Sequence, residues 1–283
     1  MNQIGQAISE IHSLQQLSNE DTWINRLHPL GKLILTVFYI VVAVSFPKYE
    51  LPGLLSMALY PAAVFIIGDL SFKDALKRLR IVLPLVMIFG VLNPFFDKKI
   101  VMEIGSLQIS GGVVSMITLM IKGILTVLAG YLLIATTSIE KICRALRILH
   151  VPKTFVTVVL LIFRYVTVLL SEARRITQAY QLRAPNQKGV HYKVWGSLLG
   201  QMLLRSMDRA NDVYDSMLLR GFDGEFPAGK SEKVKPADML WPLVWIVILA
   251  LLRLFPIVQW IGSFFMPAVP AASALQQFST EVL

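Results

Sequence analysis

Residues 112–137 read GVVSMITLMIKGILTVLAGYLLIATT, a long apolar run whose single charge is Lys122. A helix needs about 20 mainly apolar residues to cross a bilayer. The run meets that length, and glycine is more frequent in membrane helices than in soluble ones. The stretch therefore predicts a membrane-spanning helix, and it decides the fold class of the chain.

Four other apolar stretches predict further membrane helices on either side of this one. They lie at residues 30–46, 51–70, 79–96 and 240–255. Pro47 ends the first, because proline has no backbone N–H to donate and its ring clashes with the preceding helical turn. The predicted fold is therefore all-α: a polytopic membrane protein with about five spanning helices and a hydrophilic helical region between the fourth and the fifth.

The domain organisation follows from these runs. We expect an N-terminal segment with the first four spans, a hydrophilic region that ends in a linker, the fifth span, and a C-terminal tail. These parts are residues 1–137, 138–239, 240–256 and 257–283.

The composition agrees with a membrane protein. Of the 283 residues, 55% are hydrophobic and only 16% are charged, whereas about a quarter of the residues are charged in a typical soluble domain. This hydrophobicity excludes a disordered chain, and a single cysteine cannot form an internal disulfide. The first 20 residues are polar and lack the pattern of a cleaved signal peptide. We therefore expect the first apolar helix to insert as an uncleaved span.

The distribution of charge predicts the orientation. The net charge is +9, and residues 138–238 hold 16 lysines and arginines against 9 aspartates and glutamates, hence +7. A basic region can bind nucleic acid, but basic residues also concentrate on the cytoplasmic side of membrane proteins. Because this region follows a membrane span, the second interpretation is favoured: a lipid bilayer and no nucleic acid. The N-terminus and residues 138–239 are then cytoplasmic, while residues 97–111 and the tail, which lacks lysine and arginine, face outward.

The hydrophilic region predicts three helices, at residues 138–150, 152–184 and 192–220. Within the second, residues 154–170 form an apolar run broken by Arg164. Basic clusters flank this run on both sides, and crossing the membrane would place one of them outside, against the positive-inside rule. We expect the run to lie on or beside the membrane, or beneath other helices.

The two long helices of this region end alike. Leu182-Arg183-Ala184 matches Leu219-Arg220-Gly221 at an offset of 37 residues. A helix end that carries a guanidinium group beside a small residue suits insertion into a groove lined with carboxylates. Apolar residues at similar helical spacing also arise by chance, and a cytoplasmic arginine usually lies on a solvated face, so these alternatives stay open on the pattern alone.

No constellation for catalysis, metal or cofactor binding is present. Residues 224–231 match a P-loop formally, but no strand precedes them and Pro236 leaves too little room for the helix that such a loop requires. Cys143 and His150 lie seven residues apart on one helix, about 10 Å, whereas two zinc ligands must each approach the ion within about 2.3 Å. We therefore expect no catalytic residue, no metal site and no bound cofactor.

Lys122 is a charge within a predicted span, which makes it a functional candidate by default. It could line an ion path or contact a substrate. The structural alternative is that its ammonium group snorkels to the membrane surface or pairs with a polar group of the bundle, such as Asn93.

Four sequence motifs resemble one known family, the T component of energy-coupling factor (ECF) transporters, which includes the cobalt-type member CbiQ. The resemblance covers about residues 26–254. Its most specific part is the stretch in which RSMDRA leads to MLLRGFDG. The motifs are RLHPLGK at 26–32, LNPFF at 92–96, RSMDRA at 205–210 and MLLRGFDG at 217–224.

The resemblance implies a non-catalytic membrane scaffold of an ABC-type importer in a bacterial or archaeal cell membrane. Two ABC ATPase subunits would hydrolyse ATP and dock on two Ala-Arg-Gly-like helix ends, here Leu182-Arg183-Ala184 and Leu219-Arg220-Gly221. A separate membrane subunit, the S component, would bind the substrate, a micronutrient such as cobalt or a vitamin, and residues 154–170 would offer it a surface. Leu182-Arg183-Ala184 departs from Ala-Arg-Gly at two positions, and Leu219-Arg220-Gly221 departs at one. The alternative is a self-sufficient secondary transporter or channel, which predicts inverted repeats among the spans; none is found.

Overall fold

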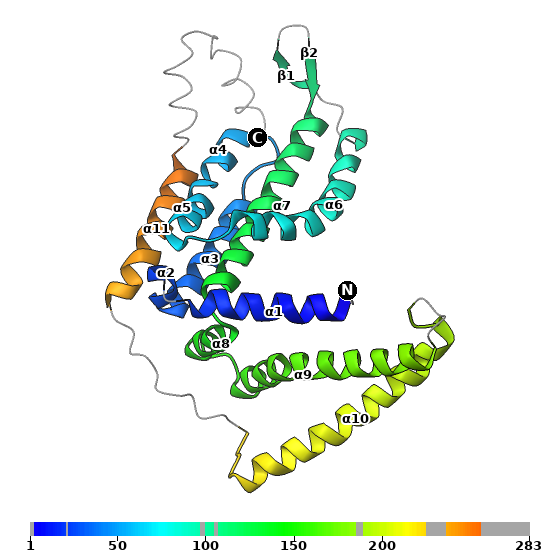
Figure 1. Ribbon diagram of the computed structural model, residues 1–283. Helices are drawn as coiled ribbons and strands as arrows, with labels where there is room; N and C mark the ends of the chain where they lie inside the picture. The colour runs from blue at the N-terminus through cyan, green and yellow to red at the C-terminus, as the bar shows by residue number, and fades with distance from the viewer. Residues whose placement is uncertain are drawn as a thin grey trace. The chain divides into compact units, whose positions relative to one another are not determined.

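The computed structural model describes residues 3–20, 22–96, 100–104, 107–184, 189–224 and 236–255. Helices make up nearly all of this part of the chain (Figure 1). The predicted fold class, a polytopic helical membrane protein, is confirmed. The chain forms two compact units, one of residues 1–34 and 131–240 and the other of residues 35–130 and 241–283.

The first unit holds the hydrophilic helices. Two of them, α9 and α10, are the longest in the unit and form a V, and α1 packs alongside α9 (Figure 1). The three helices predicted for the hydrophilic region are confirmed, and each predicted end lies within two residues of the observed end. The helices of this unit are α1 (Gln3–Asn19), α2 (Trp23–Arg26), the start of α3 (Pro29–Val44), the end of α7 (Gly111–Thr136), α8 (Ile139–Ile148), α9 (Lys153–Arg183) and α10 (Tyr192–Leu219).

The second unit holds the rest of α3 and most of α7 and α11, together with the elements between α3 and α7. The structure differs from the sequence expectation at several places. The helix predicted at residues 51–70 is interrupted at residues 57 and 58, so two shorter helices replace it. Helix α6 begins seven residues before the predicted start at residue 79, because its polar first turns continue the apolar helix. A small antiparallel hairpin also occupies part of the expected outward loop. The elements are α4 (Leu51–Ser56), α5 (Leu59–Gly68), α6 (Phe72–Phe96), β1 (Ile100–Ile104), β2 (Leu107–Ser110) and α11 (Pro236–Leu254).

An aromatic cluster joins three helices of the second unit. The Tyr39 ring of α3 lies 4.9 Å from the Tyr60 ring of α5, which in turn lies 5.4 Å from Trp245 of α11 in an edge-on arrangement. Tilted and edge-on pairs are favoured by the aromatic quadrupole. The Tyr39 hydroxyl donates a hydrogen bond of 3.0 Å to the carbonyl oxygen of Met57. These contacts hold α3, α5 and α11 together around buried side chains.

Helices α6 and α7 approach closely at Gly123. A Cβ atom on this residue would lie 3.0 Å from Cγ2 of Val86, closer than carbon atoms normally pack. Membrane helices use small residues in this way, because dispersion contacts between backbones replace the hydrophobic driving force. The glycine therefore sets the distance between the two helices.

Within the described ranges, three helical stretches are long and apolar enough to cross a membrane by length and composition: residues 51–68, 111–136 and 153–183. Helix α3 is a shorter apolar helix. The third stretch is α9, and only 11% of its most apolar window is buried inside the molecule. Composition alone therefore does not separate a spanning α9 from one that lies beside the membrane, and its location stays a prediction.

Candidate docking site at the ends of α9 and α10

Helix α10 ends in a glycine-dependent turn directly after Arg220. The N–H of Gly221 donates to the carbonyl oxygen of Leu218 at 2.9 Å, and the N–H of Phe222 donates to that of Met217 at 3.0 Å. These two bonds form a Schellman motif. Gly221 has φ +77°, a conformation that glycine adopts without the steric cost that a Cβ atom imposes. The small residue after Arg220 is therefore required by the fold itself.

Helix α9 ends differently. Ala184 has φ −130° and ψ 65°, and its N–H donates to the carbonyl oxygen of Tyr180 at 3.0 Å. This backbone is outside the left-handed region, so alanine fits without strain. The departure of this motif from Ala-Arg-Gly at its last position thus has a conformational explanation.

Both ends present an apolar side chain and a cation to solvent. Leu182 is 84% exposed and Leu219 is 90% exposed, and Arg183 and Arg220 are exposed beside them. Single exposed apolar residues are ordinary. Here, however, two exposed leucines recur at the same offset, each next to an arginine that can form paired hydrogen bonds with a carboxylate. The arrangement can bind an acidic groove with an apolar floor.

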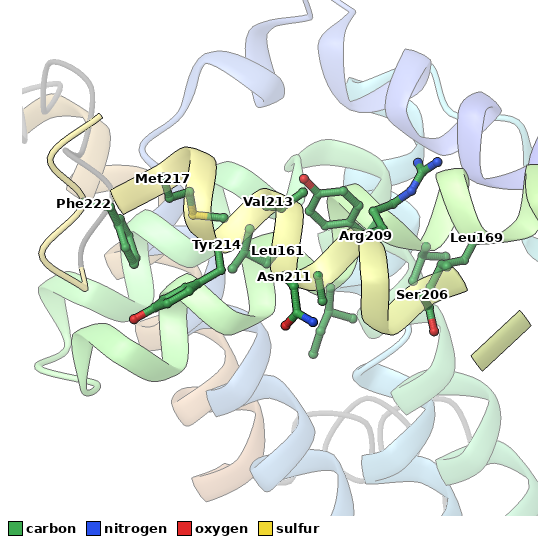
Figure 2. A pocket seen from close by; sticks show the side chains of 13 residues that line it. Leu161, Leu169, Ser206, Arg209, Asn211, Val213, Tyr214, Met217 and Phe222 are labelled. Carbon is green, nitrogen blue, oxygen red and sulfur yellow. The ribbon is translucent and has the colours of Figure 1, made fainter. Parts of the chain in front are cut away.

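A groove of about 600 Å³ lies between α9 and α10 (Figure 2). Met217 and Phe222 lie toward one end of the groove, and Leu169 and Ser206 toward the other. The residues that close the α10 turn therefore also line the groove. Sequence reasoning quoted Phe222 only within a motif and did not name Tyr214; the available signal was apolar residues at helical spacing in α10, such as Val213 and Met217. The lining side chains are mostly apolar: Leu161, Ile162, Tyr165, Val166, Leu169, Ser206, Arg209, Ala210, Asn211, Val213, Tyr214, Met217 and Phe222.

An ion pair links α9 and α10. The Arg205 guanidinium group of α10 contacts the Glu172 carboxylate of α9. The Arg205 side chain is 62% exposed and that of Glu172 20%, so solvent partly screens the attraction. The pair links the two helices beside the groove.

Lys122 has a structural role at the end of α3. Its ammonium group donates to the carbonyl oxygens of Val44, at 3.0 Å, and Phe46. Helix α3 has 16 residues and is about 24 Å long, less than the roughly 30 Å of a bilayer core. Its last carbonyl groups therefore need partners inside the protein. Lys122 supplies one, and the Arg253 guanidinium group supplies another at Ser45, 3.4 Å away.

Asn93 has a different partner. Its side-chain amide donates to the Ser115 hydroxyl at 3.3 Å, which links α6 to α7. The pairing of Lys122 with Asn93, suggested as one structural alternative, is replaced by these two separate contacts.

The motif at 26–32 joins the start of α3 to the end of α7. The buried Lys32 ammonium group donates to the carbonyl oxygens of Ile24, at 3.0 Å, and Thr136, at 2.8 Å. His28 accepts a hydrogen bond from the N–H of Leu30 at 3.2 Å on Nδ1. Sequence reasoning used this motif only for the resemblance. Lys122 was singled out because it is a charge inside a predicted span. The same rule applies to Lys32 and would have identified it.

The part of the chain that the structure describes contains no group of three or more histidine, cysteine, aspartate or glutamate residues that could hold a metal ion. Cys143 of α8 is buried, and burial raises the pKa of its thiol. The formal P-loop match lies, apart from Gly224, outside the described residues, and α10 precedes it.

The comparisons with known proteins agree with one another. The family model CbiQ, described as cobalt transport protein, matches residues 20–231. An energy-coupling factor transporter transmembrane protein EcfT from Thermotoga maritima is 27% identical over 250 residues, which cover 82% of this chain and 89% of that protein. EcfT from Leuconostoc gelidum is 24% identical over 222 residues, 71% of this chain and 80% of that protein.

An uncharacterised protein from Methanocaldococcus jannaschii is 26% identical over 215 residues, 71% of this chain and 74% of that protein. The family match covers well over half of the chain. The chain therefore belongs to the CbiQ family, that of the transmembrane T components of energy-coupling factor transporters, and is a multi-pass membrane subunit of such a transporter.

Proposed function

We propose that this subunit couples two ABC ATPases to a substrate-binding S component, for uptake of a micronutrient such as cobalt or a vitamin. The ends of α9 and α10 each dock on one ATPase. The observation that carries the proposal is the repeated, exposed leucine-arginine pair, with Leu182 and Leu219 at 84% and 90% exposure. Solvent alone gives no reason to place a leucine there.

Charge supports ATPase docking in place of a lipid contact at these ends. A bilayer core would accept the leucines but not the arginines beside them. An acidic protein groove satisfies both, since Arg183 and Arg220 can each form two parallel hydrogen bonds with a carboxylate. ATP hydrolysis then belongs to the partners, and this subunit is non-catalytic.

The apolar faces of α9 and α10 are proposed to contact the S component. The apolar window of α9 is only 11% buried within the chain, and α10 has no buried residue. An apolar face left open by its own chain favours cover by lipid or by another subunit. In this arrangement a movement of the ATPases at the helix ends shifts the surface on which the S component rests.

The proposed orientation places the N-terminus and helices α8 to α10 in the cytoplasm of a bacterial or archaeal cell. The positive charge of residues 138–238 supports it. The alternative, a self-sufficient channel, relied on Lys122 lining a path. The engagement of its ammonium group with the end of α3 supports a structural role instead.

The experiment is co-purification from the native membrane in mild detergent, with the partners identified by mass spectrometry. We expect ABC ATPases and a small membrane protein with the unmodified chain. The double variant Arg183→Glu and Arg220→Glu should reduce ATPase binding more than a hundredfold, since each charged contact contributes about 1.5–3 kcal/mol.

The matched control is Arg144→Glu with Arg175→Glu, which makes the same change in charge on exposed positions of α8 and α9. This control should retain the ATPases. ATPases that co-purify undiminished with the first double variant, while it remains monodisperse and helical, would exclude docking through these ends.

A further inference from the structure

A second, polar pocket of about 230 Å³ lies in the first unit, between the end of α1, the short helix α2 and the first turn of α8. Its lining includes two cations, Arg26 and Lys141, and one carboxylate, Glu20. The docking function uses none of these residues.

The wall of this pocket is a well-bonded turn. The Asn25 amide donates to the carbonyl oxygens of Leu17, at 2.9 Å, and Glu20, at 2.8 Å. Asn25 and Ser18 are both buried. The connection from α1 to α2, which forms one wall of the pocket, is therefore held by side-chain hydrogen bonds.

The pocket lies beside the ends of two apolar helices, the start of α3 and the end of α7. Arg26 precedes Pro29, the first residue of α3, and Lys141 follows Thr136, the last residue of α7. The Lys32 ammonium group bonds the carbonyl oxygen of Thr136, so the start of α3 and the end of α7 lie side by side. Headgroups extend several ångströms beyond each side of the hydrocarbon core, so in the proposed orientation the pocket lies at their level.

The side chains offer donors suited to a phosphate group. A guanidinium group has five N–H donors and an ammonium group three, and both form short, charge-assisted bonds with phosphate oxygens. With Glu20 the formal charge of the pocket is +1, which suits one phosphodiester. Basic pockets between membrane helices at this level bind anionic headgroups.

We propose that this pocket binds the phosphate group of an anionic phospholipid through Arg26 and Lys141, with Glu20 limiting the affinity. The lipid fixes the depth at which α3 and α7 enter the membrane. The same chemistry would accept a free phosphate ion, so the test separates these two sources.

The test measures phospholipid retention by native mass spectrometry on the full-length protein, with phosphatidylglycerol, phosphatidylcholine or inorganic phosphate added. Three single variants are expected to change the affinity for phosphatidylglycerol differently. Lys141→Gln should lower affinity for phosphatidylglycerol about tenfold, and Glu20→Gln should raise it. Arg144→Gln, one turn along α8 and outside the pocket, should leave it unchanged.

Phosphatidylglycerol binding that follows this order, with phosphatidylcholine bound less, supports the lipid source. Phosphate binding that follows the same order without preference between the two lipids supports the phosphate site with a soluble source. Equal losses in Lys141→Gln and Arg144→Gln, or no change in any variant, would overturn the proposal, because net charge or no site at all would then explain the result.

Discussion

The ends of α9 and α10 carry the same two residues, leucine and arginine, on two different backbones. Helix α10 closes through Gly221 at φ +77° with two bonds back to its last turn. Helix α9 closes through Ala184 at φ −130° with one bond. The arginine is common to both ends, whereas the geometry that follows it is not.

This difference separates two reasons for a small residue after the arginine: the conformation of the backbone and the space that a docked partner needs. At Gly221 the backbone demands glycine whether or not a partner binds. At Ala184 the negative φ does not demand glycine, so under the proposed docking a small residue there leaves space for the partner. The comparison therefore predicts that substitution changes the stability of the protein by different amounts at the two positions.

The largest effect is expected at the arginines themselves. Arg183→Glu and Arg220→Glu, made singly, should each lose about tenfold to a hundredfold in affinity for one ATPase. Each variant should keep the second ATPase on its intact end, which native mass spectrometry of the complex would count. A complex that loses both ATPases in one variant and neither in the other would break the equivalence of the two ends.

Exchanging the small residues tests the backbone difference. Gly221→Ala should destabilise the protein by about 1–2 kcal/mol, because an L-residue is forced into the left-handed conformation. Ala184→Gly should cost less, about 0.4–1 kcal/mol, through the unfolded chain alone. Thermal unfolding in detergent compares them. Equal shifts would contradict the assignment of a left-handed closing turn to α10 and not to α9.

A third helix end extends the comparison. Helix α8 also closes with a left-handed residue, but this residue is His150, at φ +62°. Its N–H donates to the carbonyl oxygen of Arg147 at 3.1 Å, and the N–H of Val151 to that of Leu146 at 3.2 Å. His150→Gly should therefore stabilise the protein by about 0.5–1 kcal/mol. A lower melting temperature would show that the histidine side chain contributes more than its conformation costs.

The smallest effect on stability is expected from breaking the ion pair between α9 and α10. Glu172→Gln removes the charge that faces Arg205, and exposed pairs contribute about 0.2–1 kcal/mol. We expect a decrease of about 0.5 kcal/mol at low salt that disappears at high salt. A loss that persists at high salt would mean that the glutamate has a packing role. Asp208→Asn, an equal change in charge on α10, is the control.

The sequence predicted the helices well because their ends carry strong signals. Pro152 precedes α9, and Gly221 follows α10, and both residues restrict the backbone locally. The start of α6 was misplaced because hydropathy locates the apolar part of a helix and not its polar first turns. The hairpin after α6 was missed because a short loop gives little periodicity to read.

The candidate site was only partly predictable. The repeat of Arg183 and Arg220 is visible in the sequence, although docking itself stays a prediction. The groove depends on which faces of α9 and α10 meet, and the sequence alone does not show which side chains on the two helices face each other. The partners of Lys122 were also beyond sequence reasoning, because its acceptors lie 76 and 78 residues earlier in the chain.

That separation has a consequence for biosynthesis. The acceptors of Lys122, at the end of α3, leave the ribosome well before α7 does. A lysine at the centre of an inserting helix costs about 2.5–3.5 kcal/mol. Because α3 precedes α7 in the chain, the carbonyl groups that accept from Lys122 are already made when α7 enters the bilayer. The order of the helices in the sequence thus becomes an order of assembly, in which Lys122 of the later helix bonds the unsatisfied end of the earlier one.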